Sequence, residues 1–389
     1  MGYEKDDCSA LGIKYGNVKV APEKLVCRLP MIKKRVEVMK MTNIEIIKET
    51  SRVLLENKAW ESIYDRYAKE IISNQEKYGS NSRLFQVNCP LLVYSCIGKV
   101  ISSANTTAYD LRFAGQSVGL LEVNKKKKVK VRLTVSAGQA KYAKEKFGFS
   151  ESKELKGVDW KLDRGAISFR RFFLNNESTN EVAIRSPEHR IESELLKEFS
   201  KKTRKKDKHL CNIQPVRLGG KFFQLTTPLK GSTHIPTLSL RENEKGATGG
   251  GIDILARIKH SAFSFRYAVI ELKDENKDNE SQEETMFQAL IYATFMAHLF
   301  RSESGNSWWY LMKNKPLTDE GINETNVPDH IDLDVITLMP EGSSGEGDLK
   351  DLELEDLNVT LHLYTLYYKT DKNGNPCGFV GTLVDELNQ

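Results

Sequence analysis

Residues 246–277 of the chain read GATGGGIDILARIKHSAFSFRYAVIELKDENK, and they carry the clearest structural pattern in the sequence. It holds two apolar runs of strand length, 252–258 and 267–273, which predict two strands. The first run carries the carboxylate of Asp253 near its start, and the second carries Glu271 near its end. If the two strands are neighbours, these carboxylates converge at one end of a sheet.

A pair of carboxylates held close together in a partly desolvated place needs a cation, because the two charges repel each other. A divalent metal ion resolves the repulsion, and all-oxygen ligands with room for water suit Mg²⁺ or Mn²⁺ rather than zinc. Side chains alternate along a strand, so Lys273 shares a face with Glu271 while Leu272 faces the other way. Lys273 is therefore a candidate to polarise or deprotonate an attacking water, or to stabilise charge that builds up on phosphorus.

These residues resemble the signature of the PD-(D/E)XK nuclease superfamily, which has the restriction-endonuclease-like fold. Gly250-Gly251-Ile252-Asp253 is followed after seventeen residues by Glu271-Leu272-Lys273, although the chain has Gly-Ile rather than Pro before Asp253. The resemblance implies a core of one helix, three strands, a second helix and another strand. It also implies metal ligands from Asp253, Glu271 and the backbone carbonyl of Leu272. Lys273 would then assist the hydrolysis of a phosphodiester.

A second helix is predicted downstream of the two strands, over ETMFQALIYATFMAHLF. Ser281 and Glu284 have the spacing of a capping box at its start. Gln288 and Tyr292 lie four residues apart and share a face of this helix. The pair resembles the Q-x-x-x-Y element of some nuclease lineages in the superfamily, in which the glutamine lies near the catalytic site. The alternative is an exposed Gln288 and a Tyr292 that belongs to the core.

Upstream of the strands, Ser186-Pro187 predicts the start of a helix over EHRIESELLKEFSKK. Glu192 lies at the edge of its apolar stripe and resembles the helix glutamate that supports the metal in some family members. Glu188 and Glu194 compete for that role, and a glutamate in the N-terminal half of a helix also complements the helix dipole. Residues 221–229, KFFQLTTPL, are expected to form the first strand of the nuclease sheet.

The two ends of the chain carry opposite charge. Residues 1–250 hold 47 Lys and Arg against 28 Asp and Glu, and residues 251–389 hold 11 against 25, so their net charges are +19 and −14. A basic front half suggests binding to a polyanion, and uneven surface charge is the alternative. Two basic runs, one at a predicted hairpin tip and one at a helix end, are candidate contacts to a phosphate backbone, and the alternative is that they are simply solvated. Their residues are Lys125, Lys126, Lys127, Lys128, Lys201, Lys202, Arg204, Lys205 and Lys206.

The length of the chain predicts two or three domains, with a boundary near the polar stretch NNESTN. Residues 1–180 are expected to form a basic α+β region that recognises nucleic acid. This region would contain a pair of helices from Thr42 and a β-hairpin of strands at 107–123 and 129–135. Residues 186–389 are expected to form the nuclease domain, of α+β or mixed α/β class, with a central mixed sheet flanked by helices.

Composition and motifs argue against several other classes. No apolar run approaches the ~20 residues of a membrane span, and the first residues, MGYEKDDCSALG, lack the apolar segment of a secretory signal. A cytoplasmic protein that does not bind membranes is therefore expected. The six cysteines form no C-x-x-C pair, which argues against a zinc ribbon and a disulfide framework. The chain also lacks the G-x-x-x-x-G-K-[ST] loop and the G-x-S-x-G nucleophile elbow.

The sequence therefore favours a magnesium-dependent deoxyribonuclease, an endonuclease of restriction, defence or repair type, with double-stranded DNA as the expected substrate. A cut through both strands would favour a homodimer, because one site hydrolyses one strand at a time. The alternative is a catalytically silent nucleic-acid-binding protein built on a nuclease-like core. The intact Asp253, Glu271 and Lys273 speak against that alternative.

Overall fold

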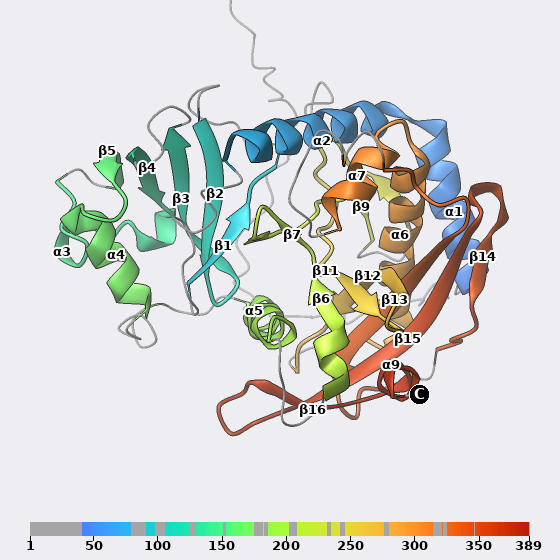
Figure 1. Cartoon of the computed structure of the whole chain (residues 1–389). Helices are drawn as coiled ribbons and strands as arrows, with labels where there is room; N and C mark the ends of the chain where they lie inside the picture. Colours follow the sequence, from blue (N-terminus) through green and yellow to red (C-terminus); the bar gives the residue numbers. More distant parts are fainter. Residues whose placement is uncertain are drawn as a thin grey trace, which may run out of the picture. The chain divides into compact units, whose positions relative to one another are not determined.

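Two mixed seven-stranded sheets and the helices around them make up most of what the computed structural model describes (Figure 1). This arrangement confirms the expected α+β class with mixed sheets flanked by helices. Among the described helices, none is both long enough and apolar enough to cross a membrane. The described residues are 41–78, 91–97, 106–124, 130–150, 153–174, 182, 186–201, 208–231, 235–241, 246–275, 280–313, 321, 325–345 and 347–388.

The second sheet contains the two strands predicted from residues 246–277. Its order is β14-β15-β13-β12-β11-β6, with β16 paired to β15. Strand β11 runs antiparallel to both β6 and β12, whereas β12, β13 and β15 run parallel to one another. Parallel neighbours need a crossover, and α6 lies in the crossover from β12 to β13. The bounds are β6 (Ile213–Pro215), β11 (Ile254–Lys259), β12 (Phe265–Leu272), β13 (Ile331–Pro340), β14 (Leu352–Leu354), β15 (Val359–Thr370) and β16 (Pro376–Val380).

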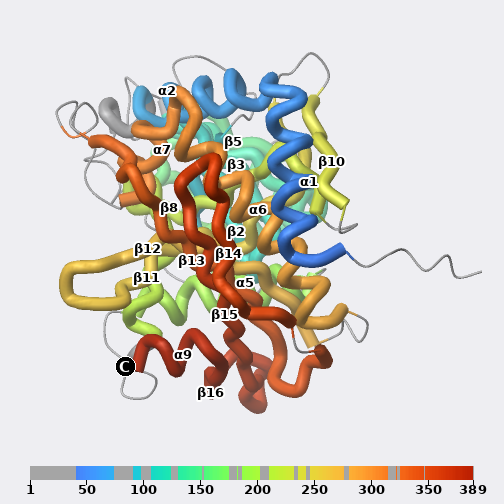
Figure 2. The backbone as a smooth tube through the Cα atoms, turned by 90° about the vertical axis from the view of Figure 1, so that its right-hand side faces the viewer, coloured from blue at the N-terminus to red at the C-terminus, as the bar shows by residue number. Residues whose placement is uncertain are grey.

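Helices cover both faces of the second sheet. Helix α6 (Gln282–Arg301) packs against β12 and β13, and α1 (Asn43–Glu56) lies beside α6 (Figure 2). Nearly all of α6 is buried, which explains why its sequence is apolar on every side. Helices α2 (Ala59–Tyr78) and α7 (Gly305–Leu311) share this core. The opposite face packs against α5 (Pro187–Phe199) and α9 (Thr382–Leu387).

Three predicted helix starts are confirmed by their capping contacts. The Ser281 hydroxyl accepts a hydrogen bond from the backbone N–H of Glu284, whose carboxylate accepts one from the N–H of Ser281, so the capping box is complete. Ser186 accepts a hydrogen bond from the backbone N–H of His189 at the start of α5. Thr42 begins α1 with a second capping box. These contacts satisfy backbone donors that a helix start leaves unpaired.

The first sheet has the order β5-β4-β3-β2-β1-β8-β7. It packs against α4 (Arg164–Leu174), and their shared core includes Phe147 together with Phe169 and Phe173 of α4. Its strands are β1 (Leu91–Ser95), β2 (Thr106–Phe113), β3 (Gln116–Asn124), β4 (Lys130–Val135), β5 (Glu154–Asp159), β7 (Arg217–Leu218) and β8 (Lys221–Phe222). The remaining short elements are α3 (Tyr142–Glu145), the 3-10 helices η2 (Ala137–Gln139), η3 (Lys208–Asn212) and η5 (Glu355–Leu357), and the paired strands β9 (Leu229–Lys230) and β10 (Thr237–Leu238).

Two strand predictions are wrong. Residues 107–123 do not form one strand, because Ala114 and Gly115 both have positive φ (47° and 75°) and turn the chain between β2 and β3. Residues 221–229 do not give the strand beside β11. The positive φ of Gly219 and Gly220 folds β7 onto β8 in the first sheet, and the three-residue β6 pairs with β11 instead.

The first sheet thus takes strands from both sides of the boundary expected near residues 175–186. Strands β1 to β5 precede it, whereas β7 and β8 follow it. Helices α1 and α2, which lie in the N-terminal part of the sequence, share a core with α6. The division into regions 1–180 and 186–389 stays a prediction.

Candidate active site

The end of β12 brings together the residues that the sequence singles out. Ile254 pairs with Ile270, so Asp253 lies opposite Glu271 just beyond the paired residues. The backbone N–H of Leu272 donates a hydrogen bond of 2.9 Å to Oδ2 of Asp253. The two carboxylates therefore meet at one end of the sheet, as the alternation pattern predicts.

Lys273 is the buried cation of this site. Its side chain is 4% exposed, and its Nζ lies 3.2 Å from Oε1 of Glu271, 3.2 Å from Oε2 of Glu280 and 3.3 Å from Oε1 of Gln288. The hydroxyl of Tyr368 donates a 3.0 Å hydrogen bond to the backbone carbonyl of Lys273. Burial alone would lower the pKa of Lys273, but the surrounding carboxylates, Glu271 first, outweigh it and raise this pKa.

The carboxylates are incompletely neutralised. Glu271 is 1% exposed, and its Oε2 has no hydrogen-bond partner among the residues that the structure describes. Burial raises the pKa of Glu271 well above its usual value, and the nearby Asp253 adds to the effect. Asp253 keeps some accessible surface, yet desolvation, Glu188 and Glu192 raise its pKa to about 7.

Helix α5 supplies two glutamates to the surroundings of Asp253 and Glu271. Glu192 is 1% exposed, and its Oε1 accepts a 3.5 Å hydrogen bond from the hydroxyl of Tyr94. Its Oε2 lies 3.4 Å from Nδ1 of His189, and this pairing raises the pKa of that histidine. Glu188 lies one helical turn before Glu192 and raises the pKa of both Asp253 and Glu271. Both glutamates on this side of the helix are therefore in electrostatic reach of the carboxylate pair.

The structure also shows the positions of Glu194, the third candidate glutamate, and of the Q-x-x-x-Y pair, Gln288 and Tyr292. Glu194 forms an ion pair of 2.6 Å with Lys197 on the same helix. Gln288 is half-buried and donates from Nε2 to the hydroxyl of Tyr292 at 3.4 Å, while its Oε1 accepts from Lys273. The reading of Gln288 as an exposed residue is therefore wrong, whereas Tyr292 is buried as the core reading expects.

Gly250 is required by the packing of Tyr292. A Cβ atom at Gly250 would lie 1.7 Å from the hydroxyl oxygen of Tyr292, a distance that no side chain can adopt. The glycine before Asp253 thus lets the chain pass directly over the tyrosine that holds Gln288. This close approach gives a physical reason for a small residue at this point of the motif.

The surroundings of Asp253 and Glu271 fit a hydrated divalent cation. In the described part of the chain, no three or more His, Cys, Asp or Glu side chains form a ready-made metal-ligand group. Mg²⁺, however, usually keeps several waters and takes only one or two carboxylates from the protein. Oε2 of Glu271 has no hydrogen-bond partner in the described part of the chain, and the pKa of Asp253 is raised, so both carboxylates indicate a shortage of positive charge.

Most of the predicted DNA-contacting residues cannot be placed. Lys125, Lys126, Lys127, Lys128, Lys202, Arg204, Lys205 and Lys206 lie outside the described residues. Lys201 is exposed after the end of α5 and forms an ion pair with Glu198. The sequence patterns missed the contacts of Glu280 and Tyr368 with Lys273, and those of Tyr94 with Glu192. Only Glu280, directly before the Ser281 cap, had a local signal.

Comparisons of the chain with protein-family models, with curated proteins and with solved structures find no match. The geometry of the site is therefore what supports a function.

Proposed function

We propose that the chain is a metal-dependent endonuclease of the PD-(D/E)XK superfamily that hydrolyses DNA phosphodiester bonds. One observation carries this proposal: Asp253 meets Glu271 at the end of two antiparallel strands, with the buried ammonium of Lys273 held beside them. Acidic side chains and one lysine at a strand end are the groups that phosphodiester hydrolysis needs, because negative charge increases on the phosphate in the transition state.

The order of elements supports a restriction-endonuclease-like core. Helix α5 is followed by β6, β11, β12, α6 and β13 as the strands and helices of the second sheet. This is the order of helix, three strands, helix and strand that the sequence motif implies. The four strands are neighbours, with the antiparallel β6, β11 and β12 joined by the parallel β13.

Asp253, Glu271 and the backbone carbonyl of Leu272 would hold Mg²⁺, or Mn²⁺ in its place, and Glu192 of α5 would support the ion. The ion supplies a Lewis acid for the phosphate and a more acidic water. The side chains of the protein then orient the substrate. The three N–H groups of Lys273 face oxygens of Glu271, Glu280 and Gln288, which fix its charge beside the carboxylate pair. To donate to a phosphate oxygen or to the attacking water, the ammonium exchanges one of these three oxygens for the new acceptor.

Glu280 and Gln288 act as positioning residues in this proposal. Both contact Nζ of Lys273 rather than the proposed metal ligands. A lysine side chain has several rotatable bonds, so fixing its ammonium in advance lowers the cost of orientation in the transition state. The hydroxyl of Tyr368 fixes the backbone of the same residue.

Incubation of supercoiled plasmid and of linear single-stranded DNA with the purified protein tests the function. We expect strand breakage with Mg²⁺ or Mn²⁺, none with chelator, and none by the Lys273→Ala variant. Lys161→Ala, a change at an exposed lysine, is the matched control and should cut normally. Equal cutting by Lys273→Ala would refute the assignment. Intact DNA in every lane, with retarded mobility, would instead favour a catalytically silent nucleic-acid-binding protein.

A further inference from the structure

A polar cavity of about 150 Å³ lies next to the candidate active site. Its wall includes Tyr67 from α2, Tyr94 from β1, Arg112 from β2 and Arg241. The loop after β8 contributes residues 224–226. The cavity therefore collects side chains from the first sheet, from the loops that follow it and from the helical layer.

This cavity is connected to the active-site residues through the backbone. The N–H of Ile252 donates a 3.0 Å hydrogen bond to the carbonyl of Leu225, and Thr226 forms a β-bridge with Gly251. Asp253 follows directly. On another side, the hydroxyl of Tyr94 reaches Glu192. A group bound in the cavity would thus lie against residues that contact the segment before Asp253 and the side chain of Glu192.

The cavity carries an excess of positive charge. Its lining holds two guanidinium groups, Arg112 and Arg241, and one carboxylate, Asp110. Asp110 already accepts hydrogen bonds from Nε of Arg112 at 2.9 Å and from the hydroxyl of Ser117 at 2.5 Å. Arg241 is exposed, and no carboxylate among the described residues pairs with it. Guanidinium groups stay protonated at any relevant pH, so the site favours an anion.

Arg112 is held rigidly enough to act as a preformed anion-binding group. Its Nη1 donates a 2.9 Å hydrogen bond to Oε1 of Gln224, and its guanidinium lies 4.1 Å from the centre of the Tyr94 ring. The planar guanidinium fork matches the geometry of phosphate oxygens, which accept such donors in pairs.

We propose that this cavity binds a backbone phosphate of the substrate strand, next to the phosphodiester that is cut. The inference rests on the proposed function for the identity of the strand. The volume of the cavity, about 150 Å³, suits one phosphate group with a few waters and not a base pair. Arg241 at the exposed side attracts the phosphate, and Arg112 fixes its orientation, so the bound strand is aligned with Asp253 and Glu271.

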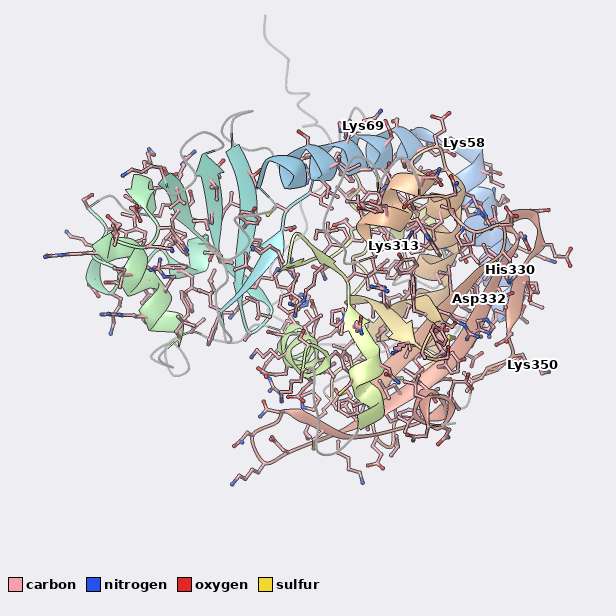
Figure 3. The ribbon with its side chains drawn as sticks, in the orientation of Figure 1. Lys58, Lys69, Lys313, His330, Asp332 and Lys350 are labelled. Atoms are coloured by element: carbon pink, nitrogen blue, oxygen red, sulfur yellow. The ribbon has the colours of Figure 1, made fainter. Side chains whose placement is uncertain are left out.

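Binding without cleavage tests the cavity. Fluorescence anisotropy with a short labelled single-stranded oligonucleotide, in chelator and over a range of NaCl concentrations, gives the affinity and its salt dependence. We expect Arg241→Ala to weaken binding by about tenfold and to reduce the salt slope by about one phosphate contact, roughly 0.7 for a single strand. Arg241→Lys should keep the slope. Lys350→Ala, an exposed lysine labelled in Figure 3, is the control and should bind normally.

The result that overturns the proposal is wild-type affinity and slope in Arg241→Ala. A second outcome would also overturn the proposal: inorganic phosphate stabilises the wild type but not Arg241→Ala, while both proteins bind the oligonucleotide equally well. The cavity would then be a site for free phosphate. Because chelator prevents cutting, this test does not depend on catalysis. If Arg241→Ala loses binding and the wild type shows no nuclease activity, the cavity is supported as a phosphate-binding site and the proposed nuclease function is refuted.

Discussion

The backbone N–H of Leu272 donates a 2.9 Å hydrogen bond to Oδ2 of Asp253. The carboxylate at the start of β11 is thus fixed by the peptide unit that joins Glu271 to Leu272 in β12. A single contact therefore sets the distance between the two acidic groups, and any change in the pairing of these strands would separate them.

Gln288 should affect catalysis through Lys273. Gln288→Ala removes an acceptor that lies 3.3 Å from Nζ of Lys273. Because a hydrogen bond to a charged group contributes about 1.5 kcal/mol or more, we expect kcat to fall at least about tenfold while KM changes little. Gln214→Ala, a change at an exposed glutamine of β6, is the control in the same plasmid assay. Unchanged kcat in Gln288→Ala would show that Lys273 needs no positioning from α6.

The metal-free protein should gain stability when the charge of Glu271 is removed. Glu271→Gln eliminates a buried carboxylate whose Oε2 has no partner among the residues described, while Lys273 keeps Glu280 and Gln288 as partners. We expect the variant to be more stable by about 1 kcal/mol in urea unfolding with chelator. Mg²⁺ should then stabilise the wild type and not the variant, because only a folded site binds the ion. A less stable variant in chelator contradicts the prediction.

The glycine next to Tyr292 should tolerate no side chain. Gly250→Ala places a Cβ against the tyrosine hydroxyl, so either the loop or α6 must shift, and we expect a loss of about 1–3 kcal/mol of stability together with lower activity. Gly251→Ala is a closely matched control, since its Cβ would meet Gln224 at an ordinary 3.4 Å. Equal urea midpoints for the two variants would show that Tyr292 moves away at no cost.

His298 should make the stability of the protein depend on pH. Burial in α6, with a smaller contribution from Lys58, lowers the pKa of this histidine from 6.5 to about 4. Between these values the unfolded chain binds a proton that the folded chain does not. Stability is therefore complete above the unfolded pKa and is lost as the pH falls toward the folded pKa, by about 1.4 kcal/mol per pH unit.

Urea unfolding at several pH values measures this dependence. His298→Gln should flatten the slope in that range, and its amide nitrogen is available to contact the Ser51 hydroxyl, which lies 3.0 Å from Nε2 of His298. His330→Gln is the control, because that side chain is 46% exposed at the start of β13 (Figure 3). A slope that persists in His298→Gln would place the responsible group elsewhere.

The sequence predicts those parts of the site that depend on local pattern. Alternation in β12 places Glu271 and Lys273 on one face, and helical spacing places Gln288 beside Tyr292. The capping box at Ser281 locates the start of α6. In each case, residues a few positions apart determine the geometry, so the chain carries the signal in one short segment.

The contacts that join distant segments could not be predicted in this way. Tyr94 and Arg112 come from the first sheet, and the hydrophobic pattern of their strands does not indicate that they reach Glu192 or Gln224. The three-residue β6 is too short to show an alternation pattern. The sequence pattern therefore favours residues 221–229 as the first strand instead. Pairing between strands depends on the whole fold, and the local pattern of a single strand does not specify it.

Strands β7 and β8 place a constraint on how the chain can be divided. They belong to the first sheet but follow α5 in the sequence, so a fragment that ends before residue 186 lacks both of them. Strand β1 would then become an open edge with unpaired backbone groups, which is a template for aggregation. The complementary fragment would carry the paired β7 and β8 without β1, the strand that β8 joins. Separate expression of the two halves should therefore give insoluble material, whereas co-expression allows the missing strands to be supplied in trans.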